Sequence, residues 1–183
     1  MRIIAGSRRS LPLKAPKGTD TRPTQDRTKE TLFNILQGDV YDARFLDLFA
    51  GSGAIALEAL SRGAQYAVMV ENAKDAISCI RQNISFTGFS DCAMLMDCDV
   101  LSALKRLEGQ PPFDIIFMDP PYRIGIESQV MGILSEAGYV TEDTIVIAEA
   151  ALCTPTDFAA QNGFAIYKTK DYKTNRHIFM RRK

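Results

Sequence analysis

Short apolar runs alternate with helical patterns along the chain after residue 45. Five runs are nearly apolar throughout, which is typical of strands that are buried on both faces of a sheet. These predicted strands are Phe45–Ala50, Tyr66–Glu71, Ala93–Asp97, Asp114–Asp119 and Thr144–Ala148. The segments between them repeat apolar residues at helical spacing, and the predicted helices are Ala54–Arg62, Ala73–Thr87, Val100–Leu107 and roughly Ile126–Ala137. This alternation predicts an α/β fold, a mostly parallel sheet with helices on both faces.

The two ends of the chain follow other patterns. Glycine and proline recur within residues 1–23, which predicts an N-terminal arm with only short extended pieces. A helix is predicted to begin near Thr24, whose hydroxyl can cap it, and to end at Gly38. Near the C-terminus, the runs Phe164–Thr169 and Arg176–Met180 are close enough for an antiparallel hairpin. We therefore expect one domain at residues 24–183, preceded by the arm.

Charge distinguishes the two ends from the middle of the chain. The 183 residues carry no net charge, but residues 1–30 hold eight Lys or Arg against three acidic residues, and residues 165–183 hold seven against one. Such clusters indicate contact with a polyanion such as nucleic acid, and the candidate contacts are Arg8, Arg9, Arg27, Arg181 and Arg182. No apolar run approaches the roughly 20 residues that span a bilayer. The N-terminus shows no secretory segment, so we expect a cytoplasmic protein.

Metal and imidazole chemistry have little support in the sequence. The four cysteines include no Cys-x-x-Cys pair, so no metal site is expected. The only histidine, His177, lies in a basic, strand-like run and is expected to be a surface residue. Catalysis is therefore expected to depend on other groups.

A glycine-containing turn joins the first predicted strand to the following helix. Gly51 and Gly53 let the backbone turn tightly and approach a ligand at the helix N-terminus. Glu71 ends the second predicted strand, where a carboxylate can accept hydrogen bonds from both hydroxyls of a ribose. With Ala56, the turn also fits the dinucleotide pattern G-x-G-x-x-G/A. Taken alone, it is compatible with both NAD and S-adenosylmethionine (SAM).

Further carboxylates bear on this choice of cofactor. Asp47 precedes the turn and favours SAM, because it could receive the ammonium group of a methionine moiety but would repel a pyrophosphate. Asp99 and Val100 follow the third predicted strand, where a carboxylate could bind the amino group of adenine. Asp97 is an alternative for that role, or a cap of the turn.

The tetrapeptide Asp119-Pro120-Pro121-Tyr122 follows the fourth predicted strand. Its prolines fix the backbone and remove two donors, which leaves carbonyl oxygens without a local N–H partner. Asp119 and the Pro120 carbonyl could accept both N–H groups of a nucleobase amine, while Tyr122 contacts the ring. Such acceptors would aim the nitrogen lone pair at a sulfonium methyl group and stabilise the developing positive charge. A rigid surface turn is the alternative, but ligands of open α/β sheets gather at this end of the strands.

Together these motifs resemble those of SAM-dependent amino-methyltransferases. The N-terminal runs Arg2–Gly6 and Thr21–Thr24, with Phe33–Leu36, are similar to those of the bacterial small-subunit (16S) ribosomal RNA guanine-N2-methyltransferases, the RsmD family. The resemblance covers nearly the whole chain. It implies a Rossmann-like, seven-stranded SAM-methyltransferase fold with a basic arm. It also implies methyl transfer to N2 of one guanine in small-subunit ribosomal RNA within an assembling particle.

The resemblance implies a role for each matched residue. Asp47, Gly51 and Gly53 would hold the methionine end of SAM, Glu71 the ribose and Asp99, with Val100, the adenine. Asp119, Pro120 and Tyr122 would hold the guanine, and Arg22 and Thr24 match a family segment beside the cofactor. One departure is Lys173, because the family usually has a glycine after the tyrosine of the last hairpin. Three alternatives stay open: an adenine-N6-methyltransferase, an NAD-linked oxidoreductase and a non-catalytic RNA-binding module.

Overall fold

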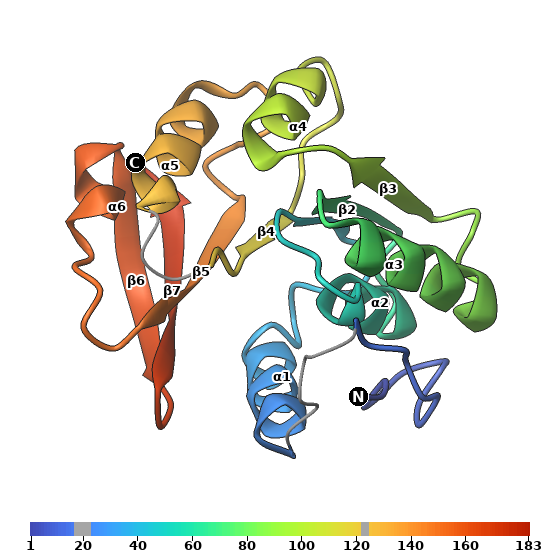
Figure 1. Ribbon diagram of the computed structural model, residues 1–183. Coiled ribbons are helices and arrows are strands. Elements are labelled where there is room, and N and C mark those ends of the chain that lie inside the picture. Colours follow the sequence, from blue (N-terminus) through green and yellow to red (C-terminus); the bar gives the residue numbers. More distant parts are fainter. Residues whose placement is uncertain (17–22, 122–124) are drawn as a thin grey trace.

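The computed structural model describes residues 1–16, 23–121 and 125–183 (Figure 1). Its strands are β1 (Arg44–Asp47), β2 (Tyr66–Glu71), β3 (Ala93–Asp97), β4 (Ile115–Met118), β5 (Ile145–Ala151), β6 (Phe164–Asp171) and β7 (Asn175–Arg182). Its helices are α1 (Pro23–Ile35), α2 (Ala54–Ser61), α3 (Lys74–Thr87), α4 (Val100–Arg106), α5 (Ile126–Glu136) and α6 (Asp157–Gln161). The described strands form one seven-stranded sheet in the order β3-β2-β1-β4-β5-β7-β6.

The pairing of the strands confirms the predicted fold class. Strands β1 to β5 pair in parallel, whereas β7 is antiparallel to both of its neighbours, β5 and β6. Strand β5 continues three residues past its predicted end, because β7 pairs along it as far as Ala151. Strand β1 ends early, at Asp47, where the chain turns into the glycine loop. Helix α6 was not predicted, since five residues are too few to show a helical period.

Helices cover both faces of the sheet, as the sequence predicts. Helices α1, α2 and α3 pack on one face, and α4, α5 and α6 pack on the other (Figure 1). Strand β4 contributes side chains to the cores on both faces, because successive side chains of a strand point to opposite faces. Ile115 and Phe117 belong to the first core, while Ile116 and Met118 belong to the second. No helix in the described ranges is long and apolar enough to cross a membrane.

The N-terminal segment, residues 1–16, folds back onto the domain. Its two halves bond to each other, with Ile3 N–H donating to the Leu11 carbonyl at 3.0 Å, and Ile3 and Leu13 are buried. Glu58 of α2 is fully buried and accepts hydrogen bonds from the backbone N–H groups of Ile4 (2.7 Å) and Ala5 (3.0 Å). This carboxylate therefore ties the segment to α2.

Candidate active site

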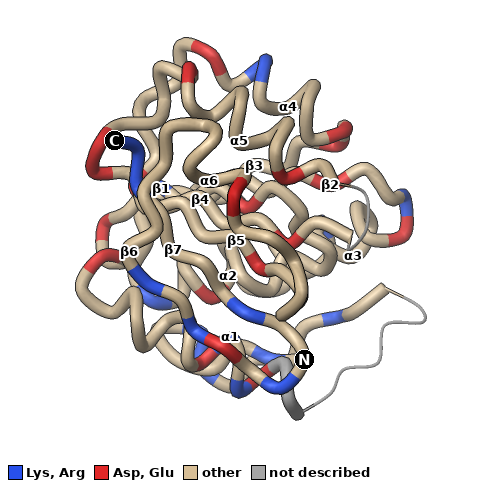
Figure 2. The backbone as a smooth tube through the Cα atoms, turned by 90° about the vertical axis from the view of Figure 1, so that its left-hand side faces the viewer, with Lys and Arg blue, Asp and Glu red and all other residues tan. Residues whose placement is uncertain are grey.

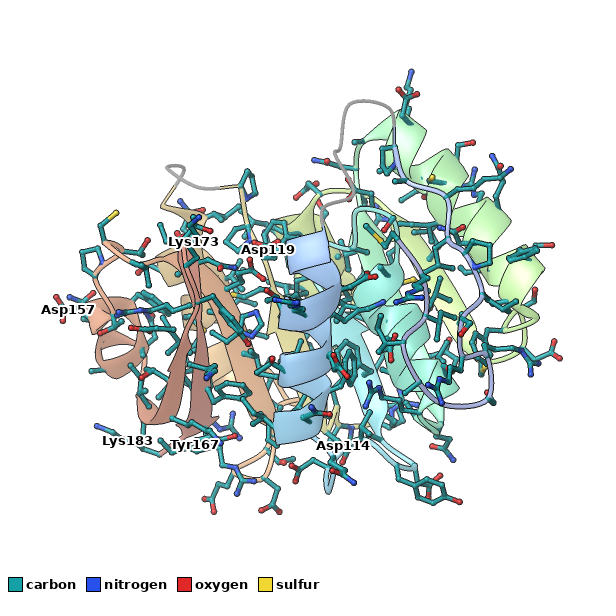
Figure 3. All side chains as sticks on the ribbon, turned by 90° about the horizontal axis from the view of Figure 1, so that it is seen from below. Asp114, Asp119, Asp157, Tyr167, Lys173 and Lys183 are labelled. Atoms are coloured by element: carbon teal, nitrogen blue, oxygen red, sulfur yellow. The ribbon has the colours of Figure 1, made fainter. Side chains whose placement is uncertain are left out.

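Acidic side chains converge at one edge of the sheet, where the parallel strands end. Asp47 is the last residue of β1, Glu71 is the last residue of β2 and Asp119 follows β4. The β4–β5 register pairs Met118 with Ala148, which places Asp119 beside Glu149 of β5. Figure 3 shows Asp119 at this end of the sheet. The structure therefore brings together the two motifs that the sequence analysis treated separately.

The loop between β1 and α2 needs glycine at two positions. Gly51 and Gly53 have φ angles of 56° and 77°, in the left-handed region that favours glycine. Among the described residues, no atom lies within 4 Å of the position that a Cβ atom of Gly51 would occupy. At Gly53, by contrast, a Cβ atom would come within 3.0 Å of the Met69 sulfur. The backbone of Gly51 thus borders open space, where a ligand can approach it.

Glu71 holds this loop in place. Its Oε2 accepts a hydrogen bond from Gly51 N–H, and its Oε1 accepts from the N–H groups of Asn72 and Ala73, all at 2.8 Å. Beside the ribose contact that the sequence predicts for it, Glu71 thus also binds the backbone of the loop. Because a carboxylate oxygen can accept more than one hydrogen bond, these contacts leave acceptor capacity for a ligand.

Asp47 is a buried carboxylate without a hydrogen-bond partner among the described residues. The residue is 1% exposed, and both of its carboxyl oxygens lack a donor. Burial raises its pKa to about 7, and the negative charge of Glu71 adds to this rise; the nearby backbone N–H groups of Phe49 and Ala56 oppose it without reaching good hydrogen-bond geometry. Native proteins rarely leave such a group unpaired unless a ligand supplies the partner. A cationic ligand group at this position would satisfy both the charge and the acceptors.

Asp119 and Pro120 form the second part of the site. Asp119 reaches solvent, and Pro120 is buried. Protein atoms surround much of the Asp119 carboxyl group, and this partial burial, with the negative charges of Glu149 and Asp47, raises its pKa. Tyr122, the third predicted residue of this motif, lies outside the described residues. So do Arg22 and the side chain of Thr24.

His177 of β7 is buried, so the prediction of a surface residue is wrong. The residue is 1% exposed, and its Nε2 lies 3.0 Å from a carboxyl oxygen of Glu149. Its Nδ1 lies 3.1 Å from the hydroxyl of Tyr172, and the Asn175 amide donates to the other Glu149 oxygen. This histidine therefore connects the last hairpin to the active site.

Glu149 was not among the predicted site residues, although its position as a charged residue within an apolar run could have indicated it. It is the only charged residue within the otherwise apolar strand Ile145–Ala151. A charge in a buried strand needs a partner, and β7 supplies one because the antiparallel register places His177 directly opposite Glu149.

Asp99, the residue predicted to bind adenine, also has a structural role. It is the N-cap of α4, where its carboxylate accepts a hydrogen bond from Ser102 N–H at 2.9 Å. Hydrogen bonds from the Ser102 side chain and from this N–H lower the pKa of Asp99. Asp99 is exposed and Val100 is buried. The alternative residue, Asp97, forms an exposed ion pair with Arg81 at 2.9 Å. Asp97 and Arg81 line a surface hollow of about 510 Å³ beside the ends of β2 and β3.

Two of the five arginines predicted to contact RNA are engaged within the protein. Arg8 donates from Nε to the Thr87 carbonyl at 2.7 Å, and its guanidinium lies 5.4 Å from the centre of the Phe89 ring. Arg182 donates to the Ser135 carbonyl at 3.2 Å. These contacts give both side chains a structural role that the sequence analysis did not foresee.

The other three arginines are exposed, and they lie in two places. Arg9 and Arg27 line one hollow of about 420 Å³ between residues 2–10 and α1. Asp26 and Glu30 line the same hollow, so cations there face acidic side chains. Arg181 lies apart from them, on β7.

Comparisons with known proteins identify the family and the fold of the chain. The family model described as Conserved hypothetical protein 95 matches residues 1–181. "Ribosomal RNA small subunit methyltransferase D" of Haemophilus influenzae is 35% identical over 150 residues, covering 81% of this chain and 78% of the relative. The protein of that name from Escherichia coli (strain K12) is 36% identical, covering 82% and 74%. Among solved structures, the yhhF protein of Escherichia coli has a TM-score of 0.86 and 31% identity, covering 100% of this chain and 98% of that one.

Proposed function

The chain belongs to the family described as Conserved hypothetical protein 95, and from this premise we propose that it methylates N2 of a guanine in small-subunit ribosomal RNA with SAM as methyl donor. Its fold is the Rossmann-like, seven-stranded fold of SAM-dependent methyltransferases. The names of the relatives support a ribosomal RNA substrate. The choice of guanine N2 is supported by the resemblance of the Asp119–Tyr122 motif and the N-terminal runs to the RsmD family.

Asp47 is the observation that carries this proposal. Its buried, unpaired carboxylate fits the ammonium group of the methionine part of SAM. It does not fit NAD, because a pyrophosphate would bring further negative charge to the same place. Gly51 and Gly53 would bring the backbone close to the ligand, and Glu71 would bind the ribose. The adenine would lie by Asp99 and Val100. SAM, when bound, supplies an electrophilic methyl group.

Asp119 and the Pro120 carbonyl would hold the target amine. Two acceptors on its two N–H groups orient the nitrogen lone pair and oppose its delocalisation into the ring. The nitrogen becomes positively charged as it is methylated and must then lose a proton. The Asp119 carboxylate stabilises this charge and can accept the proton, for which a pKa above the usual aspartate value is suitable.

The charges of Asp47 and Asp119 also influence each other. The negative charge of Asp47 is one cause of the raised pKa of Asp119. A ligand ammonium group beside Asp47 offsets that charge, so binding of the cofactor lowers the pKa of Asp119. Burial and the charge of Glu149 still raise this pKa, so cofactor binding removes one of three contributions and favours the ionised form of Asp119, which accepts hydrogen bonds from the amine.

Methylation of ribosomal subunits tests the proposal directly. The protein is incubated with methyl-labelled SAM and small subunits from cells that lack it, and the RNA is digested to nucleosides. Label should appear in N2-methylguanosine. Label in N6-methyladenosine or in protein would refute the assignment, and tighter binding of NADH than of SAM would favour an oxidoreductase. The absence of any methyl transfer, together with full function of Asp119→Ala in cells, would favour a non-catalytic RNA-binding module.

A further inference from the structure

One face of the β6–β7 hairpin carries exposed cations that no described helix covers. The register pairs Ala165 with Arg181, Lys168 with Phe179 and Lys170 with His177. Paired residues point to the same face of a sheet, so the three cations share the face of Phe179 and His177. We call Tyr167, Lys168, Lys170, Lys173 and Arg181 the basic strip; all five are exposed.

An aromatic side chain stands at one end of the basic strip. The β6–β7 register shifts between Ile166 and Lys168, and this irregularity brings Tyr167 to the same face as Phe179 and Arg181. The Tyr167 ring is 6.3 Å from the Phe179 ring, and the Arg181 guanidinium lies 5.6 Å from its centre. Tyr167 is nevertheless 51% exposed. An exposed aromatic ring beside a guanidinium group is suited to stacking with a nucleobase.

The basic strip leads toward the candidate active site. Figure 3 shows Lys173 at the same end of the molecule as Asp119, with Tyr167 at the opposite end of the hairpin. Tyr167 lies four residues before Asp171, the end of β6, which is about 13 Å of strand at roughly 3.3 Å per residue, and Lys173 follows in the turn. Lys170 is paired with His177 on the adjacent strand β7. His177 in turn contacts Glu149 of β5, which lies beside Asp119. The strip therefore leads toward Asp119, which would hold the guanine.

Charge around the strip favours an anionic partner. The only acidic residue of β6, Asp171, points to the other face, where it pairs with Arg176 at 3.1 Å. Figure 2 views the molecule from this edge and shows Lys and Arg along β6 and β7, with Asp and Glu among the cations around α1. The charge of Asp39 acts on Tyr167, at the far end of the strip from Asp119. Lysines on an edge strand also prevent pairing with other chains. That role, however, does not require an exposed tyrosine beside an arginine.

We propose that the basic strip binds a single-stranded segment of the RNA substrate and directs it to Asp119. Its cations contact phosphates, and Tyr167 stacks on an unpaired base. This inference rests on the proposed function and adds to it a surface and an orientation for the RNA.

RNA binding at several salt concentrations tests the strip. The double variant Lys168→Ala/Lys170→Ala should reduce the slope of log Kd against log salt by about two, roughly one for each lost phosphate contact. The matched control is Lys105→Ala/Arg106→Ala, which removes two exposed cations from α4 and should leave the slope unchanged. Fluorescence anisotropy with a labelled small-subunit RNA fragment measures both. Equal slopes in the two double variants would overturn the proposal.

Tyr167 gives an independent test of stacking. Tyr167→Leu should weaken RNA binding about 5- to 150-fold, the range for loss of one base–aromatic stack, and Tyr167→Phe should restore it. Equal binding of the leucine and phenylalanine variants would refute the stacking role. SAM affinity, measured by calorimetry, should be unchanged in all of these variants. If the wild-type protein methylates small subunits while the strip variants bind RNA normally, only the strip is refuted; if the wild type does not methylate guanine, the proposed function fails.

Discussion

Replacing the Asp47 carboxyl group with an amide, as in Asp47→Asn, should stabilise the ligand-free protein. The side chain is fully buried, and its pKa rises from 3.8 to about 7 on folding. Each pKa unit corresponds to about 1.4 kcal/mol, so the ionised carboxylate costs the folded protein about 4 kcal/mol. A proton on the carboxyl group removes this cost, and an amide removes it at every pH.

The sign of the pH dependence follows from linkage. Between about pH 4 and pH 7 the folded chain holds a proton at Asp47 that the unfolded chain has released. The free energy of unfolding therefore falls as pH rises through this range. The advantage of Asp47→Asn should grow from about 1.5 kcal/mol at pH 5 to about 4 kcal/mol at pH 8. Any pH-independent cost of burying the amide cancels in the difference between the two pH values.

Urea unfolding at pH 5 and pH 8 measures this difference. The matched control is Asp143→Asn, an exposed aspartate whose replacement should change stability little at either pH. Asp47→Asn should also weaken SAM binding, measured by calorimetry, because the ammonium group loses its ionic partner. A gain that is equal at both pH values, or absent at pH 8, would show that Asp47 is not an unpaired buried carboxylate. SAM binding of wild-type strength would remove the main support for the cofactor site.

Three further substitutions test other parts of the structure. Asp119→Ala should lower kcat by at least about 10²-fold with SAM affinity nearly unchanged, because one acceptor of the developing charge is lost. Single-turnover assays measure the rate and calorimetry measures SAM affinity, and a parallel loss of SAM affinity would argue against this role. Glu149→Gln should move the acidic limb of the kcat–pH profile to lower pH, since the charge of Glu149 raises the pKa of Asp119; an unmoved limb would show that Asp119 does not govern it. Glu58→Gln should lower the free energy of unfolding by about 3–5 kcal/mol, because Lys29 Nζ (3.1 Å) and Arg62 Nε (2.8 Å) lose the carboxylate that pairs with them. A loss below about 1 kcal/mol in urea unfolding would contradict this role of Glu58.

The sequence alone predicted the features that depend on local patterns. Apolar runs identified the five parallel strands and the helices between them. Strands β1, β2, β4 and β5 are largely buried, whereas β3, at the edge of the sheet, is only partly buried. The positions of Gly51 and Asp119 after such strands predicted where a ligand would lie, since strand ends gather at one edge of a parallel sheet. These inferences needed no knowledge of which strands are neighbours.

Only the tertiary structure decided which distant residues share a partner. His177 looked like a surface residue in a basic run, but the insertion of β7 between β5 and β6 places it opposite Glu149. Arg8 likewise looked free for RNA, yet the N-terminal segment folds so that it reaches the Thr87 carbonyl. Burial and hydrogen bonding depend on contacts between residues far apart in the chain. Such contacts are set by strand order and by the packing of the termini, which local periodicity does not encode.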